Sequence, residues 1–278
     1  MTKQIQRVAV IGCGWLGTPL AYHLVAKGYQ VRGSRQHTSS RAELTQAGVI
    51  NAALSLTPTL QCSESLRLFN DCDLLIINIP PKRKAHDAPF YIAQIDALIA
   101  VAIEYQIPRV LFISSTSVYG EQQTQVDETL RPEPSSDSGH TLLAIEQKLM
   151  SNRAFRTSIL RFGGLIGPGR HPGRFLAGRT VDGGDTPVNL IHQRDCIGLI
   201  SAIIKQDTFP GVFNACCDGH PTRRDFYTAA ANVLQLAPPL FSDVPGISKV
   251  IGNQLIKQTL NYTFQVPDPV CWIEQEIP

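Results

Sequence analysis

Short runs of β-branched and other apolar residues alternate along the chain with longer stretches in which apolar residues recur every three or four positions. A continuous apolar run is typical of a parallel strand buried on both faces, whereas the longer spacing is typical of an amphipathic helix. Residues 7–11, RVAVI, show the strand pattern most clearly, and residues 90–105 show the helix pattern. The pattern predicts further strands at 29–33, 74–78, 109–114 and 157–162, and further helices at 16–27, 42–47 and 139–152.

This alternation predicts an α/β fold in which a doubly wound parallel sheet binds its ligand at the carboxyl ends of the strands. After about residue 163 the pattern loosens, because Pro and Gly become frequent in GGLIGPGRHPGR and only short elements follow. Those elements are a helix at 196–205, a strand at 211–215 and a helix at 224–234. We therefore expect the sheet domain over residues 1–165 and a small, interwoven substrate-binding lobe over residues 166–278.

The length and the charge of the chain narrow the classes of protein that fit. At 278 residues it can form one full α/β core with a small second lobe. Its 25 Lys and Arg against 23 Asp and Glu give a net charge of +2 without a block of like charge, which disfavours nucleic acid and membranes as partners. No apolar run approaches the ~18 residues that a membrane span needs, and glycines interrupt the apolar N-terminus, which argues against a signal peptide.

Cysteine usage indicates a reducing compartment. The seven cysteines are an odd number, and they form no CxxC pair and no Cys/His spacing that would bind a metal. Adjacent Cys216 and Cys217 are poor disulfide partners for each other. We expect reduced thiols in a cytoplasmic protein, and no metal site.

A glycine-rich turn follows the first predicted strand, in VAVIGCGWLG at residues 8–17. In such a turn Gly12 permits the tight bend, Gly14 lets a diphosphate approach the backbone, and Gly17 lets the helix pack closely on the strand. The helix N-terminus then offers N–H groups and a partial positive charge to the phosphates. A purely structural turn is the alternative, but the position between a β-branched strand and a helix favours dinucleotide binding.

The residues after the second strand predict which dinucleotide is bound. Specificity for NAD usually needs an acidic residue there to accept both ribose hydroxyls, and no acidic residue precedes Glu43. The segment VRGSRQHTSSR instead places Arg32, Ser34 and Arg35 where they could donate to a 2′-phosphate. A solvated basic loop is the alternative interpretation. We predict NADP(H) as the cofactor in preference to NAD(H).

The fifth predicted strand carries a resemblance to a known family. RVLFISSTSVYGE at residues 109–121 closely resembles the strand-five signature of the extended short-chain dehydrogenase/reductases, the NAD(P)-dependent epimerase/dehydratase family. The resemblance covers about residues 5–270 and implies a Rossmann fold with NAD(P) bound by the N-terminal domain. Within this family, the tripeptide IPP at 79–81 and the small total length of the chain resemble an atypical subgroup. Three further segments match in family order: ILRFGGLIGPGR at 159–170, NLIHQRDCIGLI at 189–200 and GVFNACCDGHPTRRDFY at 211–227.

The resemblance also implies roles for individual residues. Ser115, followed by Thr116, takes the position of the family's catalytic Ser or Thr, which hydrogen-bonds the substrate oxygen. Gly164 stands where the family often has Asn, which puts one substrate contact in doubt. The cofactor positions that the resemblance implies surround the diphosphate, the ribose and the nicotinamide, and they are Gly12, Gly14, Trp15, Leu16, Gly17, Ile79, Pro80, Ser114, Phe162, Gly163 and Gly164.

One part of the family pattern is missing. Family members carry Tyr-x-x-x-Lys, and alignment on Glu146-Gln147 places Ser138 at the Tyr position and Leu142 at the Lys position. The family's chemistry uses a phenol whose pKa is lowered by the ammonium one helical turn along. A Ser hydroxyl is a far poorer proton donor, and Leu carries no charge. No tyrosine between residues 119 and 227 rescues the pair.

Other groups could replace the missing acid or bind substrate. His140 has a suitable unperturbed pKa, but two positions from Ser138 it faces another side of a helix. Tyr119 is a second candidate acid. Arg170 and Arg174 could bind an anionic group of a substrate, such as a phosphate.

Two kinds of function follow from these patterns. The first is an NADP-dependent oxidoreductase or epimerase that acts on a small carbonyl compound or a nucleotide-linked sugar without the usual Tyr–Lys pair. The alternative is a catalytically inactive NADP(H)-binding sensor or interaction protein. Family members commonly dimerise through the helices expected here at 90–105 and 139–152, so the resemblance implies a homodimer as one arrangement.

Overall fold

The computed structural model describes residues 4–35, 42–57, 59–61, 66–81 and 88–275. The chain folds into two compact units, each built from three segments. Unit 1 comprises Met1–Val118, Ser136–Leu160 and Ile200–Val212. Unit 2 comprises Tyr119–Ser135, Arg161–Leu199 and Phe213–Pro278. The predicted boundary between residues 165 and 166 falls within the middle segment of unit 2, and the two units alternate along the chain.

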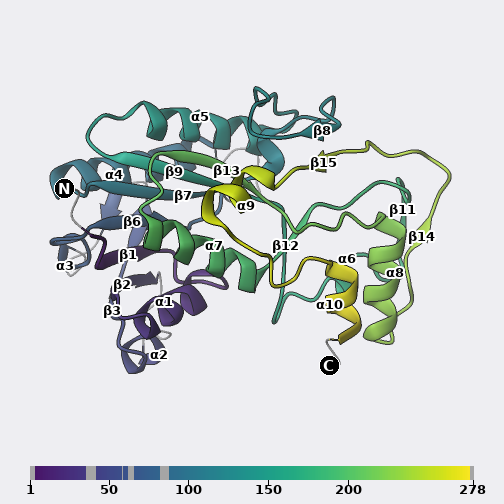
Figure 1. The fold of residues 1–278 in the computed structure, drawn as a ribbon, viewed down its shortest axis with the longest axis horizontal. Coiled ribbons are helices and arrows are strands. Elements are labelled where there is room, and N and C mark those ends of the chain that lie inside the picture. The colour runs from purple at the N-terminus through teal and green to yellow at the C-terminus, as the bar shows by residue number, and fades with distance from the viewer. Residues whose placement is uncertain (1–3, 36–41, 58, 62–65, 82–87, 276–278) are drawn as a thin grey trace. The chain divides into compact units, whose positions relative to one another are not determined.

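A seven-stranded sheet forms the centre of the fold (Figure 1). From β1 the strand order runs through β2 and β3 to one edge, and through β6, β7 and β9 to β13 at the other. The pairs β1–β2, β1–β6, β2–β3 and β6–β7 are parallel. This order confirms the predicted doubly wound sheet, whose direction changes beside β1. The strands are β1 Arg7–Ile11, β2 Gln30–Arg35, β3 Ile50–Ala53, β6 Leu74–Ile77, β7 Arg109–Ser115, β9 Arg156–Phe162 and β13 Gly211–Ala215.

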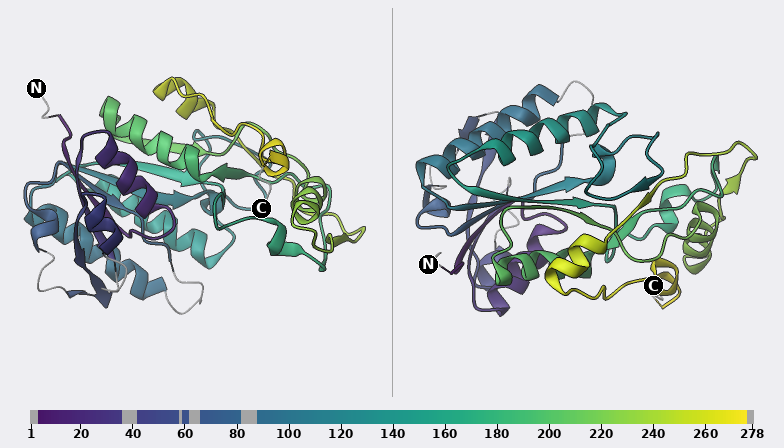
Figure 2. Two further views of the ribbon diagram at one scale, coloured as in Figure 1. Left: turned by 90° about the horizontal axis from the view of Figure 1, so that it is seen from below. Right: turned by 45° about the horizontal axis from the view of Figure 1, so that its top comes forward.

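Helices cover both faces of the sheet in unit 1. Figure 2 shows α4 and α5 together on one face, with α1 on the other. The central strands between them are buried at residues 8–11 of β1 and throughout β6, which explains their continuous apolar runs. The helical elements of unit 1 are α1 Gly17–Ala26, α2 Ala42–Gln46, α3 Leu66–Phe69, α4 Ala88–Glu104, the 3-10 turn η3 Thr116–Val118 and α5 Asp137–Ser151. Residues 200–206 of α7 Gln193–Gln206 also belong to it.

Of the elements between β2 and β6, only the helix at 42–47 was predicted, and it forms α2. The segment also contains β3 and an antiparallel hairpin of β4 Ser55–Thr57 and β5 Thr59–Gln61. The sequence of β3, INAA, has no run of β-branched residues, so its propensity for a strand is weak. It forms a strand because its backbone pairs with that of β2, from Arg32↔Ile50 to Arg35↔Ala53.

A buried ion pair closes the other end of unit 1. Arg109, which is 1 % exposed, donates from Nε and Nη2 to the two carboxylate oxygens of Asp207 at 2.5 and 2.7 Å. Arg156 adds two bonds to the same carboxylate at 3.1 and 3.2 Å. These bonds, led by those from Arg109, lower the pKa of Asp207. The starts of β7 and β9 are thereby joined to the residue that follows α7.

Unit 2 consists of short elements around its own core. Three two-stranded parallel sheets pair β8 with β15, β10 with β12 and β11 with β14. Buried core residues include Leu190, Phe226 and Trp272. The strands are β8 Gln125–Val126, β10 Gly164–Ile166, β11 Thr180–Val181, β12 Leu190–His192, β14 Leu240–Phe241 and β15 Val250–Ile251, and the helices are α6 Gly173–Leu176, α8 Arg223–Val233, α9 Gln254–Leu260 and α10 Pro269–Gln275.

A buried carboxylate organises the C-terminal segment of unit 2. Asp195 accepts hydrogen bonds from the Tyr262 hydroxyl at 3.0 Å and from the backbone N–H groups of Gln265 and Val266 at 2.7 and 3.0 Å. Three donors on one carboxylate fix the path of the chain at this point. Within the described residues, no helix combines the length and the apolar character that a membrane crossing requires.

Candidate functional site

The glycine turn after β1 requires glycine at two of its three positions. Gly12 has a φ of +102°, and a Cβ there would lie 2.5 Å from the carbonyl oxygen of Asn78. A Cβ on Gly17 would lie 2.2 Å from the carbonyl oxygen of Gly12. A Cβ on Gly14 would meet no other atom within 4 Å, so its backbone faces open space. Two glycines therefore make the turn, and the third leaves it accessible to a ligand.

The helix that follows the turn starts without a side-chain cap. Leu16 occupies the N-cap position of α1, and its side chain makes no capping bond. The first turn of the helix contains no acidic residue. The partial positive charge at this end of α1 is therefore not offset locally, which is the arrangement that favours an anion.

Ser34, at the end of β2, is bonded to the glycine turn. Its Oγ accepts a hydrogen bond from Gly12 N at 3.1 Å, and its carbonyl oxygen accepts one from Cys13 N at 2.9 Å. Both bonds follow from the parallel register of β1 and β2, which places Ile11 opposite Ser34. The sequence predicted Ser34 as a donor to a 2′-phosphate, and the structure places its hydroxyl against the turn.

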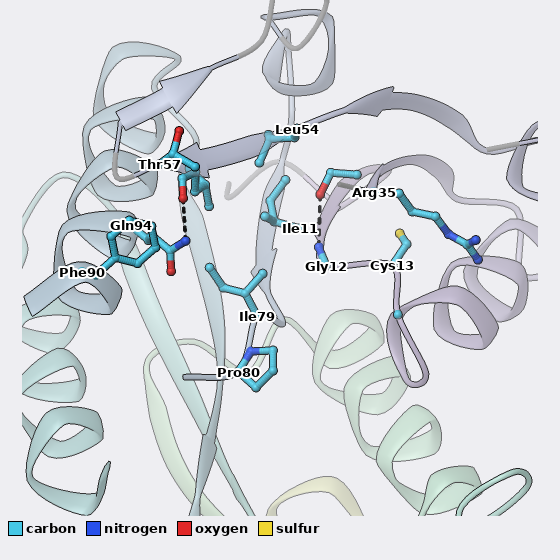
Figure 3. A pocket seen from close by; sticks show the side chains of 13 residues that line it. Ile11, Gly12, Cys13, Arg35, Leu54, Thr57, Ile79, Pro80, Phe90 and Gln94 are labelled. Atoms are coloured by element: carbon cyan, nitrogen blue, oxygen red, sulfur yellow. Dashed lines mark hydrogen bonds between the residues drawn. The ribbon is translucent and has the colours of Figure 1, made fainter. Parts of the chain in front are cut away.

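A cavity of about 520 Å³ lies at the carboxyl ends of the strands in unit 1 (Figure 3). It extends from the ends of β1 and β2 to the segment after β3, the segment after β6 and the start of α4. Predicted cofactor positions that line it are Gly12, Gly14, Ser34, Arg35, Ile79 and Pro80. The other lining residues are Ile11, Cys13, Leu54, Leu56, Thr57, Phe90 and Gln94.

The three predicted 2′-phosphate donors occupy different surroundings. Arg35 lines the cavity, and its Nη2 donates to Thr18 Oγ1 at 2.9 Å. The Nε of Arg35 is buried and has no hydrogen-bond partner among the described residues. Arg32 does not line the cavity, and it donates to the carbonyl oxygen of Asn70. Residues 36–41, the rest of the predicted basic segment, lie outside the described residues.

The far wall of the cavity consists of α4 and the β4–β5 hairpin. Gln94 of α4 donates from Nε2 to the carbonyl oxygen of Leu56 at 2.6 Å. The hydroxyl of Tyr91 donates to the carbonyl oxygen of Ile79 at 2.8 Å, and burial raises the pKa of this phenol. The first bond attaches β4 to α4, and the second attaches the segment after β6 to α4. Nothing in the local sequence indicated either one.

The end of β7 carries the predicted catalytic serine. Ser115 is partly buried, and its Oγ accepts a hydrogen bond from Ser117 N at 3.2 Å; Thr116 begins η3. Ser114 is buried and donates to Glu146 Oε1 at 2.6 Å. In the sequence, Glu146 served only to align α5 with the family, and its bond to Ser114 was not predicted. The position of this carboxylate on the apolar face of the helix could have indicated a buried partner.

The α5 positions aligned with the family's Tyr and Lys hold two unrelated side chains. Ser138 is exposed in the first turn of the helix, and its Oγ lies 3.3 Å from that of Ser136. Leu142 is 4 % exposed and packs into the core. His140 is exposed. No charged side chain occupies the position one turn after Ser138, where it would lower the pKa of a proton donor.

Tyr119, the second candidate acid, is enclosed within unit 2. Its ring and hydroxyl are 1 % exposed, and Arg161 donates to the hydroxyl from Nη1 at 2.6 Å. The hydroxyl itself donates to Asn214 Oδ1 at 3.0 Å. Burial raises the pKa of the phenol, and the Arg161 charge opposes that rise. These contacts give Tyr119 a packing role in unit 2.

The predicted nicotinamide-bordering residues also belong to unit 2. Phe162 is buried. A Cβ on Gly163 would lie 2.6 Å from the carbonyl oxygen of Asn189, and one on Gly164 would lie 2.9 Å from Leu190 Cδ2. The packing of unit 2 thus accounts for Gly163, where the close atom is backbone, but not for Gly164, where the tip of a leucine side chain could move aside. Their place beside a nicotinamide stays a prediction.

Comparisons with known proteins agree with this architecture. The sequence model of the NAD dependent epimerase/dehydratase family matches residues 8–215. Protein YeeZ of Escherichia coli K12 is 38 % identical over 269 residues, which cover 96 % of this chain and 98 % of YeeZ. Among solved structures, the fold is similar to that of UDP-N-acetylglucosamine 4-epimerase from Bacillus cereus, with a TM-score of 0.79, 16 % identity and coverage of 97 % and 94 % of the two chains. It is also similar to that of UDP-glucuronic acid 4-epimerase from Bacillus cereus in complex with UDP-glucuronic acid and NAD, with a TM-score of 0.79, 19 % identity and 98 % coverage of both chains. The chain belongs to the NAD dependent epimerase/dehydratase family.

Proposed function

We propose that this chain binds NADP(H) in the cavity of unit 1 and uses it in an oxidoreductase or epimerase reaction. The observation that carries the proposal is the position of Arg35 in the same cavity as the glycine turn. The turn provides the close backbone approach that a diphosphate needs, and Arg35 provides a charged donor for a further phosphate. No carboxylate occurs within β2, where a ribose diol would require one.

The surroundings of Arg35 explain why a phosphate suits it. A buried N–H without a partner costs about 1–3 kcal/mol, and within the part of the chain that the structure describes the Nε of Arg35 is such a group. Thr18 already holds Nη2, which aims the guanidinium and restricts its rotation. Glu43 lies 3.9 Å from Nη2 but is largely exposed, so it neutralises the guanidinium weakly. A phosphate oxygen within reach of Nε would supply the missing bond.

The proposed substrate is a small carbonyl compound or a nucleotide-linked sugar. Two structures with this fold are named as epimerases of UDP-linked sugars, which supports the second class. The nicotinamide supplies hydride transfer when the cofactor is bound. Ser115, whose hydroxyl is at the carboxyl end of β7, would donate a hydrogen bond to the substrate oxygen. The proton then comes from the substrate, from solvent or from a group other than Ser138 and Leu142.

A second function is favoured by α5. The buried apolar Leu142 and the exposed Ser138 leave that helix without a tuned proton donor. General acid catalysis typically contributes 10²–10⁴ in rate, so a chain without it would turn over slowly. The second candidate is therefore a protein that binds NADP(H) and responds to its redox state without consuming it.

Titration with NADPH and NADH tests the cofactor. We expect the wild-type chain to bind NADPH at least ~10-fold more tightly, since one charge-assisted pair contributes about 1.5–3 kcal/mol. Arg35→Ala should abolish the preference and leave NADH binding unchanged. Arg32→Ala is the matched control, because its guanidinium is bonded outside the cavity, and it should keep the preference. Equal losses of both cofactors in Arg35→Ala would contradict NADP specificity.

Turnover assays separate the two functions. Oxidation of NADPH is followed over many turnovers with a panel of carbonyl compounds, and epimerisation is followed with UDP-linked sugars. The enzyme proposal expects turnover that falls at least ~100-fold in Ser115→Ala with cofactor affinity unchanged. Tight NADPH binding without turnover of any substrate would favour the sensor.

A further inference from the structure

One wall of the cofactor cavity carries the polar side chain of Gln94. The cavity passes from the glycine turn across the ends of β2 and β3 to α4. Most of the surface at that end is apolar and comes from Leu54, Leu56 and Ile79. Figure 3 shows Gln94 beside Phe90 on the α4 wall, with Ile79 across from them.

The amide of Gln94 has a fixed orientation. Its Nε2 lies 2.6 Å from the carbonyl oxygen of Leu56. A carbonyl can only accept, so the nitrogen of the amide must face Leu56 and the oxygen must face away from it. Among the described residues, no donor bonds Gln94 Oε1. This end of the cavity therefore presents one oriented acceptor in a largely apolar wall.

The strand order determines which part of the cofactor reaches this wall. The turn after β1 would hold the diphosphate, and Arg35 at the end of β2 would hold the 2′-phosphate of the adenosine ribose. The wall includes Leu54 and Leu56, which follow β3, and Figure 3 shows Gln94 and Arg35 on opposite sides of Gly12. Because β3 is next to β2 in the sheet, the segment after β3 is on the side of the adenosine half, and adenine is the flat group that this wall would contact.

We infer that Gln94 Oε1 accepts a hydrogen bond from the exocyclic amino group of adenine and so selects an amino-purine cofactor. The inference rests on the proposed function. Leu54 and Ile79 provide apolar surfaces for a flat purine ring, and Gln94 provides the acceptor that its amino group needs. Hypoxanthine has a carbonyl oxygen at the same ring position. It would set two acceptors against each other and leave both without a donor.

The test compares NADPH with its deamino analogue, nicotinamide hypoxanthine dinucleotide phosphate in the reduced form. We expect the wild-type chain to bind NADPH roughly 10-fold more tightly, as one desolvated hydrogen bond allows. In Gln94→Leu the ratio of the two dissociation constants should fall to about 1, because the acceptor is gone. Gln147→Leu replaces an exposed amide on α5 and should keep the wild-type ratio.

A second variant tests whether the lost preference in Gln94→Leu comes from a rearrangement of the cavity wall. Gln94→Met keeps the length and volume of the side chain and should also remove the preference, with NADPH still bound. Because the readout is a ratio, a general weakening of binding does not imitate the result. NADPH binding with equal affinity for the two bases in the wild-type chain would overturn the role of Gln94 alone. Absence of binding by either dinucleotide would overturn the cofactor proposal together with this one.

Discussion

The hydroxyl of Ser34 accepts a hydrogen bond from the backbone N–H of Gly12 at 3.1 Å. This bond joins the end of β2 to the first glycine of the turn, where φ is +102°. A second hydrogen bond, from Cys13 N to Ser34 O at 2.9 Å, joins the same two segments. The shape of the turn is therefore determined partly by a residue 22 positions further along the chain.

Replacement of Ser34 by Ala should weaken all ligands that contain the diphosphate. The change leaves Gly12 N without its acceptor, which costs about 1–3 kcal/mol and loosens the turn. We expect NADPH, NADH and ADP-ribose to lose affinity by a similar factor of ~5–150, measured by isothermal titration calorimetry. Arg35→Ala provides the contrast, since it should spare ADP-ribose. A loss confined to NADPH in Ser34→Ala would show that Ser34 binds the 2′-phosphate instead.

Loss of the Asp207 carboxylate should destabilise unit 1. In Asp207→Ala, the buried guanidinium of Arg109 loses both of its bonds to that carboxylate. Removal of one partner of a buried ion pair costs about 3–5 kcal/mol, and the partial exposure of Asp207 puts the expected loss near the lower end. Urea unfolding measures it. Asp96→Ala, which breaks an exposed pair with Lys148, should cost less than ~1 kcal/mol. Equal losses in the two variants would contradict a special role for Asp207.

A pH dependence should follow from His192. This side chain is fully buried against Trp272, and burial lowers its pKa to about 4. Its pKa in the unfolded chain is near 6.5, so the unfolded state binds the proton first as the pH falls. The neutral ring thus contributes stability that is fully present above pH ~6.5 and is lost between there and pH ~4. Melting temperatures across this range should fall in the wild-type chain and fall less in His192→Phe. Parallel profiles for the two proteins would exclude His192 as the cause.

The Ser114–Glu146 bond should hold the carboxyl end of β7 against α5. Ser114→Ala removes a 2.6 Å hydrogen bond to a buried carboxylate, and we expect a loss of about 1–3 kcal/mol in the free energy of unfolding. Ser151→Ala removes a hydroxyl on the same helix that donates to Lys148 O at an exposed position, and it should change stability by less than ~0.5 kcal/mol. Chemical denaturation compares the two. A negligible effect of Ser114→Ala would mean that the bond does not stabilise the contact between β7 and α5.

Local patterns were enough to predict the framework. The apolar runs became β1, β6, β7 and β9, and the predicted strand at 211–215 became β13. Gly28 ends α1 with a φ of +89°, as a residue placed after a helix to reverse the chain should. These features depend on side chains close together in sequence, because a buried strand and a helix end are each recognisable within a few residues. The family signature at 109–121 was readable for the same reason.

Contacts between distant segments could not be predicted from the sequence. Ser34 and Arg35 are adjacent and both polar, and only the register Ile11↔Ser34 directs one hydroxyl to the turn while the guanidinium lines the cavity. Gln94 is one polar residue on a mostly apolar helix until the β4–β5 hairpin brings Leu56 to it. Glu146 meets Ser114 in the same way, across 32 residues. Strand periodicity determines which residues are buried, but the folded backbone decides which polar groups meet.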